Sequence, residues 1–169
     1  MKRLIVVLSL MLLIAPPASA ALKLNDPVPF FSLHDVTGNE FFLRDIVGDV
    51  SIHKENGVIV SFFASWCIPC RHEIPIMNSL VSEFRSKGIT VVLIDVKESI
   101  ATIKALIKEL QVDQPIFLSD PDGKTSEHYE IRFLPTTFFV GADGKLKDVI
   151  YGEIGSASVL RAAAGKLVK

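Results

Sequence analysis

The two cysteines of the chain, Cys67 and Cys70, lie two residues apart in the segment SFFASWCIPCRHEIP, residues 61–75. Such a pair can bind a metal, form a structural crosslink or exchange disulfides with another protein. A tetrahedral zinc site needs four ligands, and the four histidines of the chain are scattered singly. Covalent haem attachment needs a histidine directly after the second cysteine, where Arg71 stands. The context therefore favours redox chemistry, with zinc kept as an alternative.

The position of the pair predicts a different task for each thiol. We expect Cys67 to lie between a strand and the N-terminus of a helix, where unpaired backbone N–H groups and the helix dipole stabilise a thiolate. Cys70 follows one helical turn later and faces inward, as a resolving thiol should. Attack by Cys67 on a partner disulfide would form a mixed disulfide, from which Cys70 would release the partner.

The elements that must position this pair can be read from the hydrophobic pattern. Residues 58–63 and 89–96 are nearly continuous β-branched and aromatic runs, as in strands that are covered on both faces. Between them, residues 68–87 show apolar residues at helical spacing. A strand, a helix and a second strand at this spacing predict a right-handed crossover and a parallel pair.

The rest of the chain predicts the other parts of an α/β fold, a mixed sheet with helices on both faces. A hairpin is expected over residues 29–45 at one edge of the sheet, followed by a loop with a short strand around residues 50–53. Ser99 and Ser156 are expected N-caps of two amphipathic helices. The remaining expected elements are a strand in 114–120, a turn and short helix in 121–131, and a hairpin formed by 135–140 and 145–151.

The first twenty residues, MKRLIVVLSLMLLIAPPASA, predict an export signal cleaved after Ala20. An uncleaved membrane anchor is the alternative, although the apolar run is shorter than the roughly 20 residues of a bilayer span. Residues 21–169 are long and apolar enough to form a single domain with its own core. The remaining chain is mildly acidic, which gives no indication of nucleic-acid binding. Export would place the thiols in an oxidising compartment.

A family resemblance rests on the segments ASWCIPC, CRHEIP and RFLPTTFFV together with the predicted hairpin. In these the chain resembles thioredoxin-like proteins, and specifically the exported TlpA/ResA branch of bacterial thiol-disulfide oxidoreductases, which is related to the AhpC/TSA redoxins. The branch includes reductases that serve cytochrome c maturation. The resemblance implies a thioredoxin fold with an N-terminal β-hairpin extension over nearly all of residues 21–169.

The resemblance also implies a substrate-binding surface around the dithiol. In the family, the proline that matches Pro135 follows a cis peptide bond and faces the dithiol, and the residue before it, here Leu134, pairs with the substrate chain through its backbone. A trans proline that starts a strand is the alternative. We expect Trp66, Ile68 and Pro69 to contact the substrate as well, although Trp66 could equally belong to the core.

The acid–base group is expected on the helix. Thioredoxin itself carries a buried aspartate six residues before its first cysteine, and that position here is Ser61. Glu73 lies three residues after Cys70 on the same helical face, where the ResA-like proteins keep a glutamate. We therefore assign the proton transfer to Glu73, with a solvated helix residue as the alternative.

The dipeptide between the cysteines indicates the direction of electron flow. Ile68 and Pro69 offer Cys67 no charge and no side-chain donor, so we expect a reducing couple near thioredoxin, about −270 mV, rather than a strong oxidant at about −120 mV. The predicted function is an extracytoplasmic protein-disulfide reductase that is a monomer and uses no cofactor or metal. The expected partners are an exported disulfide-containing protein, with apocytochrome c favoured by resemblance, and a membrane electron donor.

Three alternatives stay open at this point. A thiol oxidant or isomerase would use the same dithiol at a higher potential. A Cu(I) carrier would bind the metal through both thiolates, and a peroxidase would use a cysteine in a different local motif. Residues 45–57 are longer than the connection that the family usually has between the first hairpin and the central strand. They form either a loop beside the dithiol or a surface excursion.

Overall fold

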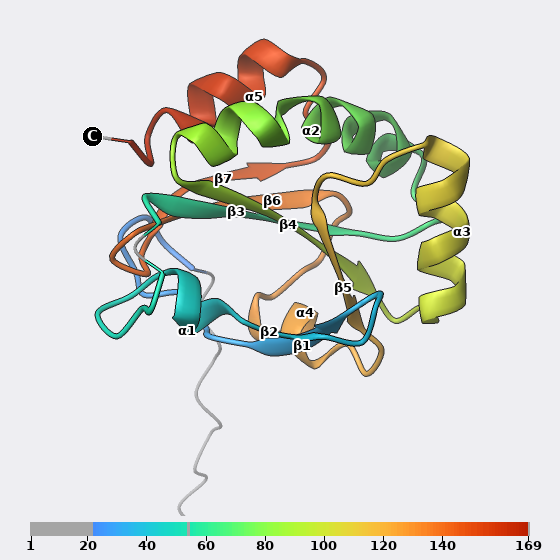
Figure 1. The fold of residues 1–169 in the computed structure, drawn as a ribbon, viewed down its shortest axis with the longest axis horizontal. Coiled ribbons are helices and arrows are strands. Elements are labelled where there is room, and N and C mark those ends of the chain that lie inside the picture. The colour runs from blue at the N-terminus through green and yellow to red at the C-terminus, as the bar shows by residue number, and fades with distance from the viewer. Residues whose placement is uncertain (1–21, 54, 169) are drawn as a thin grey trace, which may run out of the picture.

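The computed structural model of the protein describes residues 22–53 and 55–168, so the predicted signal at residues 1–20 lies outside the described part. Across those residues no helix is both long and apolar enough to cross a membrane. A mixed seven-stranded sheet runs in the order β2-β1-β5-β4-β3-β6-β7 (Figure 1). The strands are β1 (Ser32–Asp35), β2 (Glu40–Phe42), β3 (Gly57–Phe63), β4 (Ile89–Val96), β5 (Ile116–Asp120), β6 (Thr136–Gly141) and β7 (Leu146–Tyr151). The helices are α1 (Leu43–Ile46), α2 (Ile68–Ser86), α3 (Ile100–Leu110), α4 (Lys124–His128) and α5 (Ala157–Ala164).

The centre of the sheet matches the prediction. Strand β3 is buried along its whole length, pairs with β4 in parallel and pairs with β6 in antiparallel fashion. The helix α2 connects β3 to β4 and crosses one face of the sheet (Figure 1). The two predicted serine N-caps are also confirmed, because Ser99 and Ser156 each accept a hydrogen bond from the backbone three residues later.

The sheet separates the helices into two groups (Figure 1), and each face of the sheet carries its own apolar core. Alternate residues of β3 point to opposite faces, so Ile59 and Phe63 pack with α2, α3 and α5, whereas Val60 and Phe62 pack toward α1 and Tyr129, the residue that ends α4. The predicted arrangement, with helices on both faces of a mixed sheet, is therefore confirmed.

The segment before β3 differs from its prediction. Residues 50–53 form a turn and bends, so the short strand expected there is wrong, and the helix α1 precedes them instead. Val50 and Ile52 are 76% and 74% exposed, so their apolar side chains have no core to pack against. The segment leads into the N-terminal end of β3, whereas Cys67 follows its C-terminal end. The exposed part of this segment, around Val50 and Ile52, thus lies at the end of β3 away from the dithiol, whereas Val47 is buried in the core.

The predicted hairpin is confirmed as β1 and β2, joined by the turn at residues 36–39. Strand β1 pairs with β5, which places the hairpin at the edge of the sheet. Asp35 stabilises the turn by accepting hydrogen bonds from the backbone of Thr37 and Asn39.

Candidate active site

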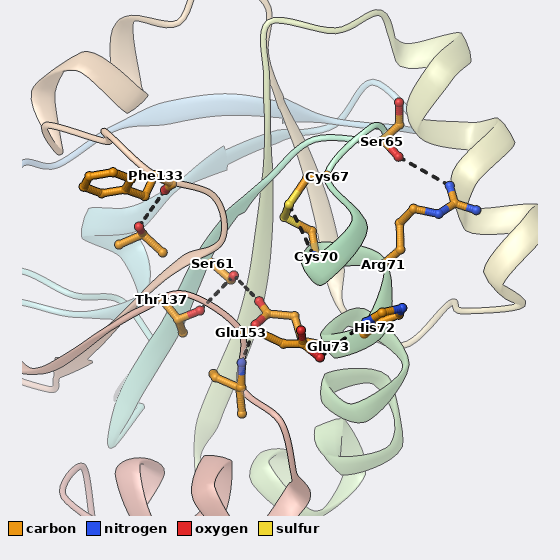
Figure 2. The surroundings of a disulfide bond; sticks show 12 residues. Ser61, Ser65, Cys67, Cys70, Arg71, His72, Glu73, Phe133, Thr137 and Glu153 are labelled. Carbon is orange, nitrogen blue, oxygen red and sulfur yellow. Dashed lines mark hydrogen bonds and ion pairs between the residues drawn. A yellow bond between two sulfur atoms is a disulfide. The ribbon is translucent and has the colours of Figure 1, made fainter.

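The two cysteines meet at the junction of β3 and α2 and form a disulfide (Figure 2). Cys67 is the N-cap of α2, and its Sγ accepts a hydrogen bond from the Cys70 backbone N–H at 3.3 Å. Cys67 is 4% exposed, whereas Cys70 is completely buried. A partner thiol or disulfide therefore reaches Cys67 more readily than Cys70. In the reduced state the free N–H groups of this helix end favour a thiolate at Cys67.

Glu73 lies inside the protein beneath the dithiol, where Figure 2 shows it directed from α2 toward β3. Its side chain is buried, with only 1% of the residue exposed. Its Oε1 accepts a hydrogen bond from Ser61 Oγ at 3.1 Å, and its Oε2 accepts one from the backbone N–H of Ile154 at 2.9 Å. The alternative in which Glu73 is a solvated helix residue is therefore wrong.

Burial changes the acidity of this carboxyl group. Removal of the carboxylate from solvent raises the pKa of Glu73 to about 7. The hydrogen bonds from Ile154 and Ser61 act in the other direction and lower the pKa, but their effect is smaller. A group with this pKa is present both as acid and as base near neutral pH. Glu73 follows Cys70 by three residues on α2, the spacing that places two side chains on one helical face. The arrangement can take a proton from the resolving thiol or return one to it.

A second carboxylate, which sequence reasoning missed, fixes the loop before Cys67. Glu98 Oε2 accepts a hydrogen bond from the Ser65 backbone N–H at 2.5 Å, and Glu98 Oε1 accepts one from Ser65 Oγ at 2.6 Å. Partial burial acts to raise the pKa of Glu98, but the bonds from Ser65 outweigh it and lower the pKa below its usual value. The Arg71 guanidinium donates to the Ser65 carbonyl at 3.4 Å. The loop is thus held from the segment after β4 and from α2.

Behind Glu98 lies the buried side chain of Asp95, whose Oδ1 accepts a hydrogen bond from the Glu98 backbone N–H at 3.1 Å. Burial, and next the neighbouring Glu98, raise the pKa of Asp95 to about 8. Asp95 is therefore mostly neutral at pH 7.

The protein surface around Cys67 is apolar and open to solvent. Trp66 is 71% exposed and Ile68 is 66% exposed, so Trp66 does not belong to the core. Pro69 is partly buried beside them. Phe133, which the sequence did not single out, is 68% exposed, and its carbonyl accepts a hydrogen bond from Thr136 Oγ1 at 2.7 Å (Figure 2). An exposed apolar face of this kind is typical of a protein-binding site.

The segment after Phe133 carries the predicted proline. The peptide bond between Leu134 and Pro135 is cis, so the alternative of a trans proline is wrong. Leu134 is half-buried and Pro135 is buried at the start of β6. Trp66, Phe133 and Leu134 together line a groove of about 330 Å³. Of the residues predicted to bind substrate, Trp66 and Leu134 line this groove, whereas Ile68, Pro69 and Pro135 do not.

Comparison with known proteins agrees with this geometry. Residues 24–149 match the AhpC/TSA family. The chain is similar to the thiol-disulfide oxidoreductase ResA of Bacillus cereus, at 30% identity over 78% of this chain and 72% of that protein. It is also similar to the ResA protein of Bacillus subtilis, at 31% identity over 78% of this chain and 69% of that one. Among solved structures, a thiol:disulfide interchange protein of the thioredoxin family from Chlorobium tepidum superimposes with a TM-score of 0.71 at 28% identity, over 89% of this chain and all of that one.

Proposed function

The chain belongs to the AhpC/TSA family and is a thiol-disulfide oxidoreductase of the ResA type, and from this premise we propose that it reduces disulfides of exported proteins outside the cytoplasm. The observation that carries the proposal is the combination of an N-cap cysteine with a buried Cys70 and a buried Glu73. The first group provides the nucleophile, the second the resolving thiol and the third a proton acceptor.

The reaction follows from these roles. The Cys67 thiolate attacks one sulfur of the substrate disulfide, and the other substrate sulfur leaves and takes a proton from water. Cys70 then gives its proton to Glu73 and attacks Cys67 Sγ, which releases the second substrate sulfur as a thiolate that also takes a proton from water. Two electrons pass from the dithiol to the substrate, which gains two protons, and the Cys67–Cys70 disulfide forms. In the return reaction a donor dithiol supplies the two electrons: its first thiol attacks Cys67 Sγ and displaces Cys70, which takes the proton back from Glu73. The second donor thiol then attacks the mixed disulfide and releases Cys67, so the donor leaves as a disulfide.

The direction of electron flow is inferred from the surroundings of Cys67. The stabilisation of a thiolate there comes from the helix end, as the hydrogen bond from the Cys70 N–H indicates. Ile68 points its side chain to solvent, and neither Ile68 nor Pro69 carries a charge. A thiolate with this limited support belongs to a reducing couple.

The partners are inferred from the exposed apolar face and from the N-terminal sequence. Trp66, Ile68 and Phe133 form a surface on which an unfolded segment around a disulfide can lie, with its backbone beside Leu134. The signal at residues 1–20 supports export, and a reductant in an oxidising compartment must be recharged. We therefore propose an exported protein, with apocytochrome c first, as substrate and a membrane thiol reductase as electron donor.

The proposal predicts which proteins a Cys70→Ser variant captures in cells. Without the resolving thiol, the mixed disulfide formed by Cys67 should persist. We expect adducts with exported cysteine-containing proteins, found by non-reducing electrophoresis and mass spectrometry. The control is the Cys67→Ser, Cys70→Ser double variant, which should capture nothing. Adducts confined to cytoplasmic proteins would contradict the proposed location and substrate class.

A further inference from the structure

Two hydroxyl groups lie behind Glu73, on strands that the cysteines do not occupy. Thr137 Oγ1 on β6 donates a hydrogen bond to Ser61 Oγ on β3 at 2.9 Å, and Ser61 Oγ donates to Glu73 Oε1 at 3.1 Å (Figure 2). We propose that Ser61 and Thr137 are positioning residues that orient Glu73 for its proton exchange with Cys70. This inference rests on the proposed function and names how its acid–base group is held.

The sheet register brings these groups together. Ser61 and Thr137 are direct partners in the antiparallel pairing of β3 and β6, and neighbouring residues on one face of such a pair lie within side-chain reach. Ser61 is 1% exposed and Thr137 is completely buried, so solvent does not replace either hydroxyl. The series of hydrogen bonds from Thr137 through Ser61 therefore ends on the Glu73 carboxylate. The two strands, rather than α2, fix the positions of both hydroxyls.

A hydroxyl is suited to this place because it can donate or accept. When Glu73 is ionised, Ser61 donates to it, as the structure shows. When Glu73 is protonated, its own O–H can donate to Ser61 Oγ, and the serine hydrogen can turn toward Thr137. Both protonation states of Glu73 thus keep a partner in a buried environment, where an unsatisfied carboxyl oxygen is costly. The carboxyl group can change its proton without leaving its position.

The titratable groups near Glu73 lie on α2 itself and in the loop after β7. Glu153, in the loop after β7, acts on it through its negative charge, which also raises the pKa of Glu73. The imidazole of His72 lies 3.5 Å from Glu153 Oε1, and Cys70 precedes Glu73 on α2. Substitution of Ser61 or Thr137 leaves all of these groups in place. A change in the titration of Glu73 can then be assigned to the hydroxyls.

The inference predicts that Ser61→Ala raises the pKa of Glu73. Loss of one hydrogen bond to a buried carboxylate should shift its titration upward by about one pH unit. At pH 7 the rate at which Cys70 resolves a mixed disulfide should then fall about fivefold, because less Glu73 is ionised. The isosteric Thr137→Val should shift the titration in the same direction by less, whereas Thr137→Ser, which keeps the hydroxyl, should restore the original value. The titration is followed through the ¹³C signal of the Glu73 carboxyl, assigned with Glu73→Gln.

The matched control is Ser119→Ala, which removes the hydroxyl of another buried serine in β5, separated from β3 by β4. It should leave the Glu73 signal unchanged. An unshifted signal in both Ser61→Ala and Thr137→Val would overturn the inference, and Thr137→Val carries the test if Ser61→Ala does not fold. The titration of Glu73 tests the role of the hydroxyls, whereas a disulfide-reduction assay tests the proposed function. If the unsubstituted reduced protein reduces no disulfide, that function fails whatever the carboxyl group does, whereas an active protein with an unshifted signal contradicts only the role of the hydroxyls.

Discussion

Cys67→Ser is expected to lower the rate of disulfide reduction on the order of 10³-fold or more, because an alcohol at this helix end does not become the anionic nucleophile that a thiol becomes. Cys70→Ser should affect a different step. Cys67 remains at the N-cap of α2 and still attacks, but the mixed disulfide is not resolved. The two variants therefore separate attack from resolution.

The measurement uses a small disulfide or insulin as substrate and follows the protein by mass spectrometry. Cys67→Ser should form no adduct, and Cys70→Ser should accumulate one adduct per molecule without further turnover. The burial of Cys70 and the slight exposure of Cys67 are the reason for this asymmetry. An adduct on Cys70 in the Cys67→Ser variant, formed as fast as the one on Cys67, would contradict the assigned roles.

Glu73→Gln is expected to slow the resolving step by roughly 10²- to 10⁴-fold, the usual contribution of a positioned acid–base group. It should also remove a pH dependence. Because the pKa of Glu73 is about 7, the rate of resolution in the unsubstituted protein should rise with pH through neutrality as the carboxylate forms. Glutamine does not titrate, so this inflection should disappear. Stopped-flow fluorescence of Trp66, the single tryptophan of the chain and the neighbour of Cys67, can follow the step.

The free energy of unfolding should fall with pH over the range in which the rate of resolution rises. The folded-state pKa of Glu73 lies above its ordinary value of 4.5, so the folded protein binds the additional proton between those two pH values. The contribution of this group is fully present below about pH 4.5 and is lost as the pH rises through about 7, a loss of roughly 3 kcal/mol in the free energy of unfolding. Glu73→Gln should abolish this loss and be more stable than the unsubstituted protein at pH 8. Urea titrations at pH 4.5 and pH 8 measure both free energies.

A matched control for both measurements is Glu83→Gln on the same helix. Glu83 pairs with Lys87 and Arg161, and hydrogen bonds from these side chains lower its pKa. This variant should keep the inflection near neutral pH in the rate of resolution and keep the loss of stability. Asp95, whose pKa is also raised, is present in all of these proteins, so it does not contribute to the difference between them. A pH profile of Glu73→Gln that matched that of Glu83→Gln would contradict the role of Glu73.

Much of this site was predictable because its elements are specified locally. The apolar runs of β3 and β4 and the periodic pattern of α2 place Cys67 at a helix end without knowledge of the fold. The spacing of Cys70 and Glu73 on one helix then directs both side chains to the same face. These features depend only on residues that lie close together in the sequence, so they can be recognised without the tertiary structure.

The partners of these residues were not predictable, since they come from distant segments. Thr137 follows Ser61 by 76 residues, and Glu98 follows Ser65 by 33, so these contacts depend on strand register and on the approach of the segment after β4. The exposure of Phe133 likewise depends on how its segment lies beside Trp66. For Val50 and Ile52, an apolar pattern predicted a strand, but no core lies near enough to bury them.

The central claim, that the dithiol acts as a reductant, is tested most directly by its reduction potential. The protein is equilibrated with thiol and disulfide buffers of defined ratio, and the reduced fraction is read from Trp66 fluorescence or from thiol alkylation. We predict a value near that of thioredoxin, about −270 mV, because the thiolate of Cys67 is supported by a helix end alone. A value above roughly −180 mV, the range of isomerases and oxidants, would contradict the claim.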